Sequence, residues 1–215
     1  AGPLVLNPLA YSGVMAAARG DEEQAHERVR QLEAIPYDIP PEHRGPRQFA
    51  LVIGTLLEDR ELVARLLPRV EEEKPRCLTC TLIFHLDVGE ARLLLGDVDG
   101  AQAKLAEAQR GNPERPGQIA ALAHLRSRIL ELRGDLDGAL QHFEEVFRLT
   151  SELPVDIFEI LHREHAGRVY LARGKPGDVE RGRQLLTDAL ETYQKLGARR
   201  FEARARKLLA SADSG

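Results

Sequence analysis

Hydrophobic positions recur along the chain at helical spacing, in stretches separated by turn residues. The stretch 134–146 shows the pattern most clearly. Gly134 suits the left-handed conformation at a helix C-terminus, and Asp135 offers a carboxylate to the free N–H groups of the next helix. Three apolar residues then fall on one helical stripe: Ala139, Phe143 and Val146. The stretch therefore predicts a helix end, a turn and the start of a second, amphipathic helix.

The same pattern recurs with a period of 38 residues. Its turn positions are Gly20, Glu58, Gly96 and Gly134, each followed by an aspartate. A fifth unit follows at Gly177, after a five-residue excess that we place in the loop 174–177. A repeat of this regularity predicts an array of helical hairpins, in which each hairpin buries its apolar face against its neighbours.

These residues resemble the tetratricopeptide repeat (TPR) family, whose pattern has Gly-Asp at the turn, then a small and a large apolar residue, and a closing proline. The closing positions correspond to Pro36, Pro75, Pro113 and Pro154. The resemblance covers nearly the whole chain and implies an all-α, right-handed α-solenoid of about five helical hairpins plus a C-terminal capping helix. The long period, with segments such as LRSRILELRGD, is similar to the divergent repeats of MalT-like bacterial regulators.

We expect a single repeat domain over residues 1–215. Its units are 8–34, 46–73, 76–110, 117–150 and 155–196, with a capping helix at 198–210. Two features depart from a minimal repeat. The segment from Ile35 to Pro46 is a long connecting loop with four prolines, and Pro68 falls inside a predicted second helix, where a proline should kink or interrupt it.

Charge and hydropathy exclude several classes of protein. The 30 basic and 34 acidic residues give a net charge of −4, which provides no overall positive field for nucleic acid. No apolar run approaches the roughly 20 residues of a membrane helix, and the N-terminus lacks a secretory signal. We expect a cytoplasmic bacterial protein without a membrane partner. A chain that begins without methionine and ends in a small polar stretch is also what we expect of a piece of a longer protein.

The chemical motifs are incomplete. Cys77 and Cys80 form a single C-x-x-C near His85, whereas a structural zinc site needs four ligands. His162 and His165 flank Glu164 at a spacing of three, whereas the metalloprotease pattern needs histidines four apart. Gly-Lys-Pro-Gly at 174–177 lacks the rest of a phosphate-binding loop. We therefore expect no catalytic site, no metal and no cofactor.

The TPR resemblance implies a different kind of site. In such arrays the first helix of each hairpin lines the concave face, so residues six and ten before each turn project into a groove. These positions are Gln48, Val52, Leu86, Glu90, His124, Arg128, Glu164 and Arg168, with Glu131 at the rim. Arg128 and Arg168 occupy the same place in consecutive units and could fork onto carboxylates or phosphates of a ligand. An equally weighted alternative is that both arginines pair with glutamates of neighbouring helices.

We therefore expect a non-enzymatic scaffold or regulatory module that binds a protein or peptide segment in its groove. The alternative is the ligand-sensing domain of a MalT-like transcriptional activator or of a cyclase or ATPase regulator, with a small-molecule effector. Self-association through an uncapped end of the array is a further expectation. The basic residues of the last helix, Arg200, Arg204 and Lys207, are interpreted as a solvated face rather than a nucleic-acid site.

Overall fold

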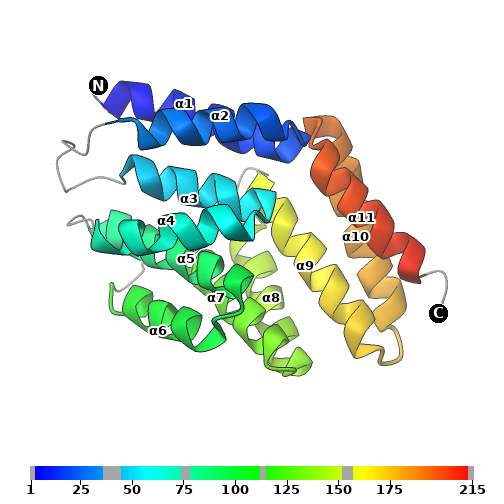
Figure 1. The fold of residues 1–215 in the computed structure, drawn as a ribbon. Helices are drawn as coiled ribbons and strands as arrows, with labels where there is room; N and C mark the ends of the chain where they lie inside the picture. Colours follow the sequence, from blue (N-terminus) through cyan, green and yellow to red (C-terminus); the bar gives the residue numbers. More distant parts are fainter. Residues whose placement is uncertain (1–2, 36–44, 74–77, 112–114, 152–156, 213–215) are drawn as a thin grey trace. The chain divides into compact units, whose positions relative to one another are not determined.

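The computed structural model describes residues 3–35, 45–73, 78–111, 115–151 and 157–212, and every regular element among them is an α-helix (Figure 1). The helices are α1 (Pro3–Arg19), α2 (Glu22–Glu33), α3 (Pro46–Leu57), α4 (Arg60–Glu72), α5 (Leu78–Leu95), α6 (Val98–Gln109), α7 (Pro116–Leu132), α8 (Leu136–Thr150), α9 (Ile157–Arg173), α10 (Asp178–Leu196) and α11 (Arg199–Ala212). Their contacts divide the chain into two compact units, Ala1–Pro113 (unit 1) and Glu114–Gly215 (unit 2). That the array continues as a single domain through residues 1–215 stays a prediction.

Each unit is built from hairpins of consecutive helices. We call α1, α3, α5, α7 and α9 the first helices, and their partners α2, α4, α6, α8 and α10 the second helices. Within a unit, neighbouring first helices are in backbone contact, whereas neighbouring second helices are not in the described part of the chain. The hairpins of each unit therefore approach one another more closely on the first-helix side than on the second-helix side. Since α11 contacts α9 and α10, it takes the place of a further first helix.

The turns form as the repeat predicts. The turn residues adopt left-handed φ values of 77° at Gly20, 57° at Glu58, 87° at Gly96 and 82° at Gly134. The carboxylate of the next residue then accepts the backbone N–H three positions on, at 3.0 Å for Asp21, 2.9 Å for Asp59, 2.8 Å for Asp97 and 2.9 Å for Asp135. Four aspartates thus cap second helices, and each satisfies a donor that the helix leaves without a partner.

The fifth turn differs from the prediction. Gly177, with φ 84°, is itself the cap of α10, and Asp178 is the first residue inside the helix. The Asp178 carboxylate accepts the backbone N–H of Lys175 at 2.9 Å and two guanidinium N–H groups of Arg173 at 2.7 and 2.8 Å. The prediction of a capping aspartate is wrong here, because the Arg173 guanidinium and the Lys175 backbone N–H supply other donors to this carboxylate.

Glu58 carries a side chain at a turn position where the backbone is left-handed. Its φ of 57° costs a residue with Cβ roughly 1–2 kcal/mol. We expect Glu58→Gly to raise the free energy of unfolding by about 1 kcal/mol, after the larger unfolded-state entropy of glycine is allowed for. Urea unfolding followed by circular dichroism measures the change. The control Glu61→Gly, in the first turn of α4, should lower stability by about 0.5–1 kcal/mol. A loss of stability in both variants would contradict a strained turn at Glu58.

The predicted apolar stripes form the cores between the helices of each hairpin. All fifteen stripe positions are buried: Ala25, Val29, Leu32, Val63, Leu67, Val70, Ala101, Leu105, Ala108, Ala139, Phe143, Val146, Gly182, Leu186 and Ala189. A small residue at the first position lets the helices approach closely. In the fifth hairpin a Cβ on Gly182 would lie 2.9 Å from the carbonyl oxygen of Gly167 on α9, so the two backbones leave no room for a side chain.

Of the predicted kink or interruption at Pro68, the interruption is wrong: α4 continues through it to Glu72. Pro68 is exposed, and so is Ala64, whose carbonyl group loses its helical partner and can be hydrated instead. The first helix starts at Pro3, ahead of the expected start. The loop residues 36–44, Cys77 and the closing prolines 75, 113 and 154 lie outside the described residues.

Within the part of the chain that the structure describes, no helix has both the length and the apolar character needed to cross a membrane.

Candidate interaction surface

In unit 1 the four predicted groove residues divide into two buried and two half-buried side chains. Gln48 on α3 is only 2% exposed, and its Nε2 donates to Oδ2 of Asp87 on α5 at 2.7 Å. Leu86 is also buried, whereas Val52 and Glu90 are half-buried. Gln48 therefore connects two first helices instead of projecting into a groove.

In unit 2 the predicted arginines lie along the contact between α7 and α9. Nε and Nη2 of Arg168 donate to the two carboxylate oxygens of Glu131 at 2.9 and 2.8 Å. Nε of Arg128 lies 3.7 Å from Oε2 of the same glutamate, and its Nη1 lies 3.4 Å from Nδ1 of His165. For Arg168 the structure therefore supports the alternative reading, in which the arginine pairs with a glutamate of a neighbouring helix. Glu131, expected at the rim, is the acceptor.

Glu164 has a role that the sequence analysis missed. Its side chain is 2% exposed, and it accepts hydrogen bonds from the Tyr193 hydroxyl at 2.7 Å and from Nε and Nη2 of Arg204, the latter at 3.0 Å. Burial and the neighbouring carboxylate raise the pKa of Tyr193. Arg204 also stacks over the ring of Phe201, 4.9 Å from its centroid. This cluster fastens α11 to α9 and α10, which removes Glu164 from the surface available to a partner.

One signal in the sequence could have revealed this cluster. Arg168 follows its acceptor Glu131 by 37 residues, and Arg204 follows Glu164 by 40, close to one repeat in both cases. An arginine one repeat after a glutamate is therefore the pattern that connects successive first helices here. The second hydrogen-bond donor, Tyr193, has no such signature, because it reaches Glu164 from a second helix.

Three histidines stack across the contact between α7 and α9. The ring centroid of His124 lies 4.2 Å from that of His162 and 5.1 Å from that of His165, in both cases with the rings stacked, and its edge meets Phe143. Burial, followed by His162 and Arg128, holds the pKa of His124 well below its usual range. Burial, followed by Arg128 and His124, does the same to the pKa of His165. Both rings are therefore neutral near pH 7 and pack as aromatic groups.

The arrangement of these residues does not suit a metal ion. Among the residues that the structure describes, no group of three or more histidine, cysteine, aspartate or glutamate side chains is placed to ligate one. The rings of His162 and His165 each stack on that of His124, and stacked rings, whose nitrogen lone pairs lie in the ring planes, are poorly arranged to share one ion.

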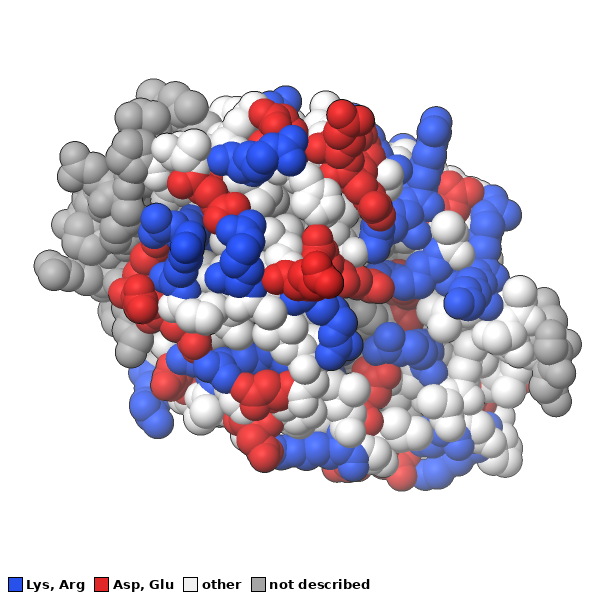
Figure 2. Space-filling model, in the orientation of Figure 1, with Lys and Arg blue, Asp and Glu red and all other residues white. Residues whose placement is uncertain are grey.

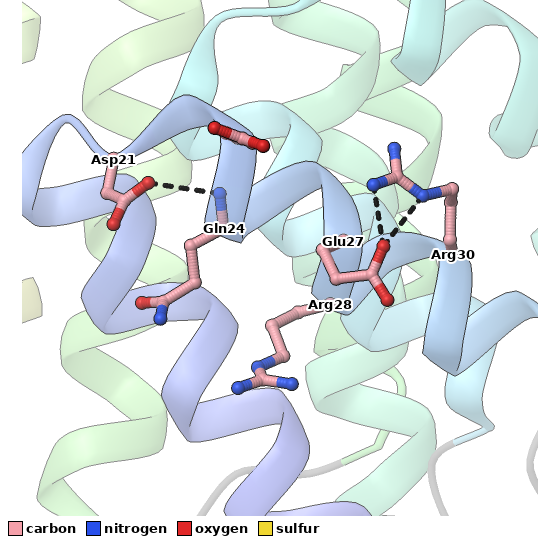
Figure 3. A pocket seen from close by; sticks show the side chains of 6 residues that line it. Asp21, Gln24, Glu27, Arg28 and Arg30 are labelled. Carbon is pink, nitrogen blue, oxygen red and sulfur yellow. Dashed lines mark hydrogen bonds and ion pairs between the residues drawn. The ribbon is translucent and has the colours of Figure 1, made fainter.

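Two surface hollows lie elsewhere. One is lined by α2 and its cap, and several of its polar groups already have partners: the Asp21 carboxylate accepts the Gln24 N–H, and Arg30 donates to Glu27 at 2.9 and 2.6 Å (Figure 3). The other lies on α11, between Arg199, Glu202, Ala203 and Arg206. Both are wide open to solvent, and neither contains a predicted groove residue. We do not consider either a ligand site.

No family model matches the chain, and no curated protein does. Among solved structures, the chain is similar to TTC0263, a thermophilic TPR protein of Thermus thermophilus. The match covers 96% of this chain and 98% of that chain, with a TM-score of 0.64 and 20% sequence identity. At this identity the likeness establishes the fold alone: the chain has an all-α, TPR-like repeat fold, as the repeat residues predicted.

A TPR-like fold establishes an architecture and not a role. It does not by itself identify which residues a partner touches.

Proposed function

We propose that this chain is a non-enzymatic scaffold or regulatory module of the bacterial cytoplasm that holds a segment of a partner protein against its first-helix faces. The supporting observation is the state of the two arginines in unit 2. Arg128 and Arg168 keep 19% and 39% of their side chains exposed while Glu131 holds them in place. Side chains that are already ordered lose less conformational entropy when a partner binds.

The proposed surface is smaller than the sequence alone suggested. In unit 2 it comprises the predicted positions whose side chains remain partly exposed, His124, Arg128 and Arg168; in unit 1 the corresponding positions are Val52 and Glu90. Gln48, Leu86 and Glu164 are left out because their side chains are buried and, for the two polar ones, already hydrogen-bonded to neighbouring helices. A helix or an extended peptide could lie across the first helices of one unit.

We do not extend the proposal to a small-molecule sensor. A pocket lined by His124, Arg128, Glu164 and Arg168 would support that alternative. The Glu164 carboxylate is already bound to Tyr193 and Arg204, so it cannot face a ligand in this arrangement. Self-association through the α1 end, and a place in a longer MalT-like regulator, stay predictions.

Site-specific photocrosslinking tests the proposal. A photoreactive amino acid is placed at position 128 on the first helix α7 and, in a matched variant, at position 148 on the exposed side of the second helix α8. Circular dichroism first confirms that both variants fold. After irradiation in lysate of the source organism, position 128 should give discrete crosslinks to a partner segment and position 148 should give none. Equal crosslinking at both positions, or none at 128, would refute a partner site on the first-helix face.

A further inference from the structure

Charge is divided between the two helix layers of unit 2. The first helices α7 and α9, together with α11, contain ten Lys and Arg against four Asp and Glu, a net charge of +6. The second helices α8 and α10 contain four basic and seven acidic residues, a net charge of −3. A positively charged layer beside a negatively charged layer creates a directed electric field, which favours binding of a negatively charged partner on the basic side.

Unit 1 lacks this division. Its first helices α1, α3 and α5 contain three basic and two acidic residues, a net charge of +1, and those two acidic residues are the half-buried Asp87 and Glu90. The basic layer is therefore a property of unit 2 and not a general consequence of the repeat.

One strip of α11 carries three basic residues, and the middle one contacts α9. Arg204 reaches Glu164 on α9, and Arg200 and Lys207 lie one turn before and one turn after it on the same strip of the helix. Lys207 is exposed and Arg200 is half-buried. Figure 2 shows Lys and Arg side chains gathered over α11, with fewer acidic side chains among them. With Arg128 and Arg168 on α7 and α9, these residues form what we call the basic face: Arg128, Arg168, Arg200, Arg204 and Lys207.

We infer that the basic face binds an acidic protein segment, rich in aspartate and glutamate. This inference rests on the proposed function above. Two of its arginines already show the geometry that such a segment would use, since Arg168 and Arg204 each bind a carboxylate through two nitrogens. The excess of positive charge on the first helices is confined to unit 2, so a short acidic segment is long enough to match it. A long nucleic acid is a poorer match, because the chain as a whole carries a net charge of −4.

Fluorescence anisotropy of a labelled peptide of alternating glutamate and alanine, titrated with the full chain, tests this inference. The peptide should bind at about 50 mM salt and weaken strongly at about 300 mM, whereas a lysine–alanine peptide should not bind. Arg200→Gln/Lys207→Gln removes two positive charges from the basic face and should weaken binding about fivefold or more. The control Arg148→Gln/Lys195→Gln removes two charges from the second helices and should change binding by less than about twofold.

Each outcome decides between specific alternatives. Equal effects of the two double variants, or no binding of the acidic peptide, would overturn the basic face as its site. Tighter binding of a single-stranded oligonucleotide than of the acidic peptide would overturn the choice of a protein partner. If crosslinking at position 128 captures a segment without acidic residues, the proposed scaffold function stands and this inference fails. If position 128 captures nothing and the acidic peptide does not bind, both fail.

Discussion

Replacing Glu164 by alanine should lower the free energy of unfolding by about 3 kcal/mol or more. The carboxylate is buried and accepts hydrogen bonds from Tyr193 and Arg204, so its loss leaves a buried hydroxyl and a guanidinium without their acceptor. We take the lower end of the usual range, because the Arg204 side chain is 28% exposed and can regain some hydration. Urea unfolding of the full chain, with hydrogen exchange to locate the loss in α9, α10 and α11, measures the effect.

Two controls distinguish the loss of the Glu164–Arg204 ion pair from a general sensitivity of unit 2 to substitution. Glu144→Ala removes a carboxylate on α8 that binds the Tyr170 hydroxyl at 2.9 Å in an exposed setting, and should cost less than about 1 kcal/mol. Removing both charges, as in Glu164→Leu/Arg204→Leu, should recover part of the loss, because no buried charge is left without a partner. If Glu164→Ala proves no more harmful than Glu144→Ala, the buried cluster does not hold α11 in place.

The second large effect is expected at Phe143. Its side chain is fully buried in a core with Ala139, Leu140, Ala166 and Val169, which joins α8 to α9. Phe143→Ala should lower the free energy of unfolding by about 3–5 kcal/mol, since it removes a large apolar side chain and leaves a cavity. Thermal and urea unfolding both report the change.

The matched control lies one turn further along the same helix. Phe147 is half-buried and packs against the edge of the same core, so Phe147→Ala should cost about 1–2 kcal/mol. The two variants share helix, residue type and change in volume, and differ in burial. Similar losses of stability in both variants would mean that the buried repeat position of Phe143 stabilises the hairpin no more than the half-buried position of Phe147 does.

Much of the architecture could be predicted before any coordinates existed. Gly134, Asp135 and Phe143 each act within a few residues along the chain or across one turn, and their roles follow from backbone conformation, capping and helical periodicity. Even the exception at Glu58 was marked by its place in the repeat, and its backbone adopts the left-handed conformation that the position requires.

The site was predicted less completely, and the errors have one cause. Position within the repeat places Gln48, Glu164 and Arg168 on first helices, but it cannot say which neighbour each side chain meets. A long polar side chain on such a helix can turn toward solvent or toward the next first helix. Glu164 turns inward because Tyr193 and Arg204 offer it three donors there.

Local chemistry therefore determined the hairpins of this protein: the period, the turns, the four aspartate caps and the buried stripes are all visible in the amino-acid sequence. Only the tertiary structure decided which charged groups stay at the surface. The partners of Arg168 and Glu164 lie 29 to 40 residues away along the chain. Their pairing depends on the spacing between stacked helices, which no local pattern encodes.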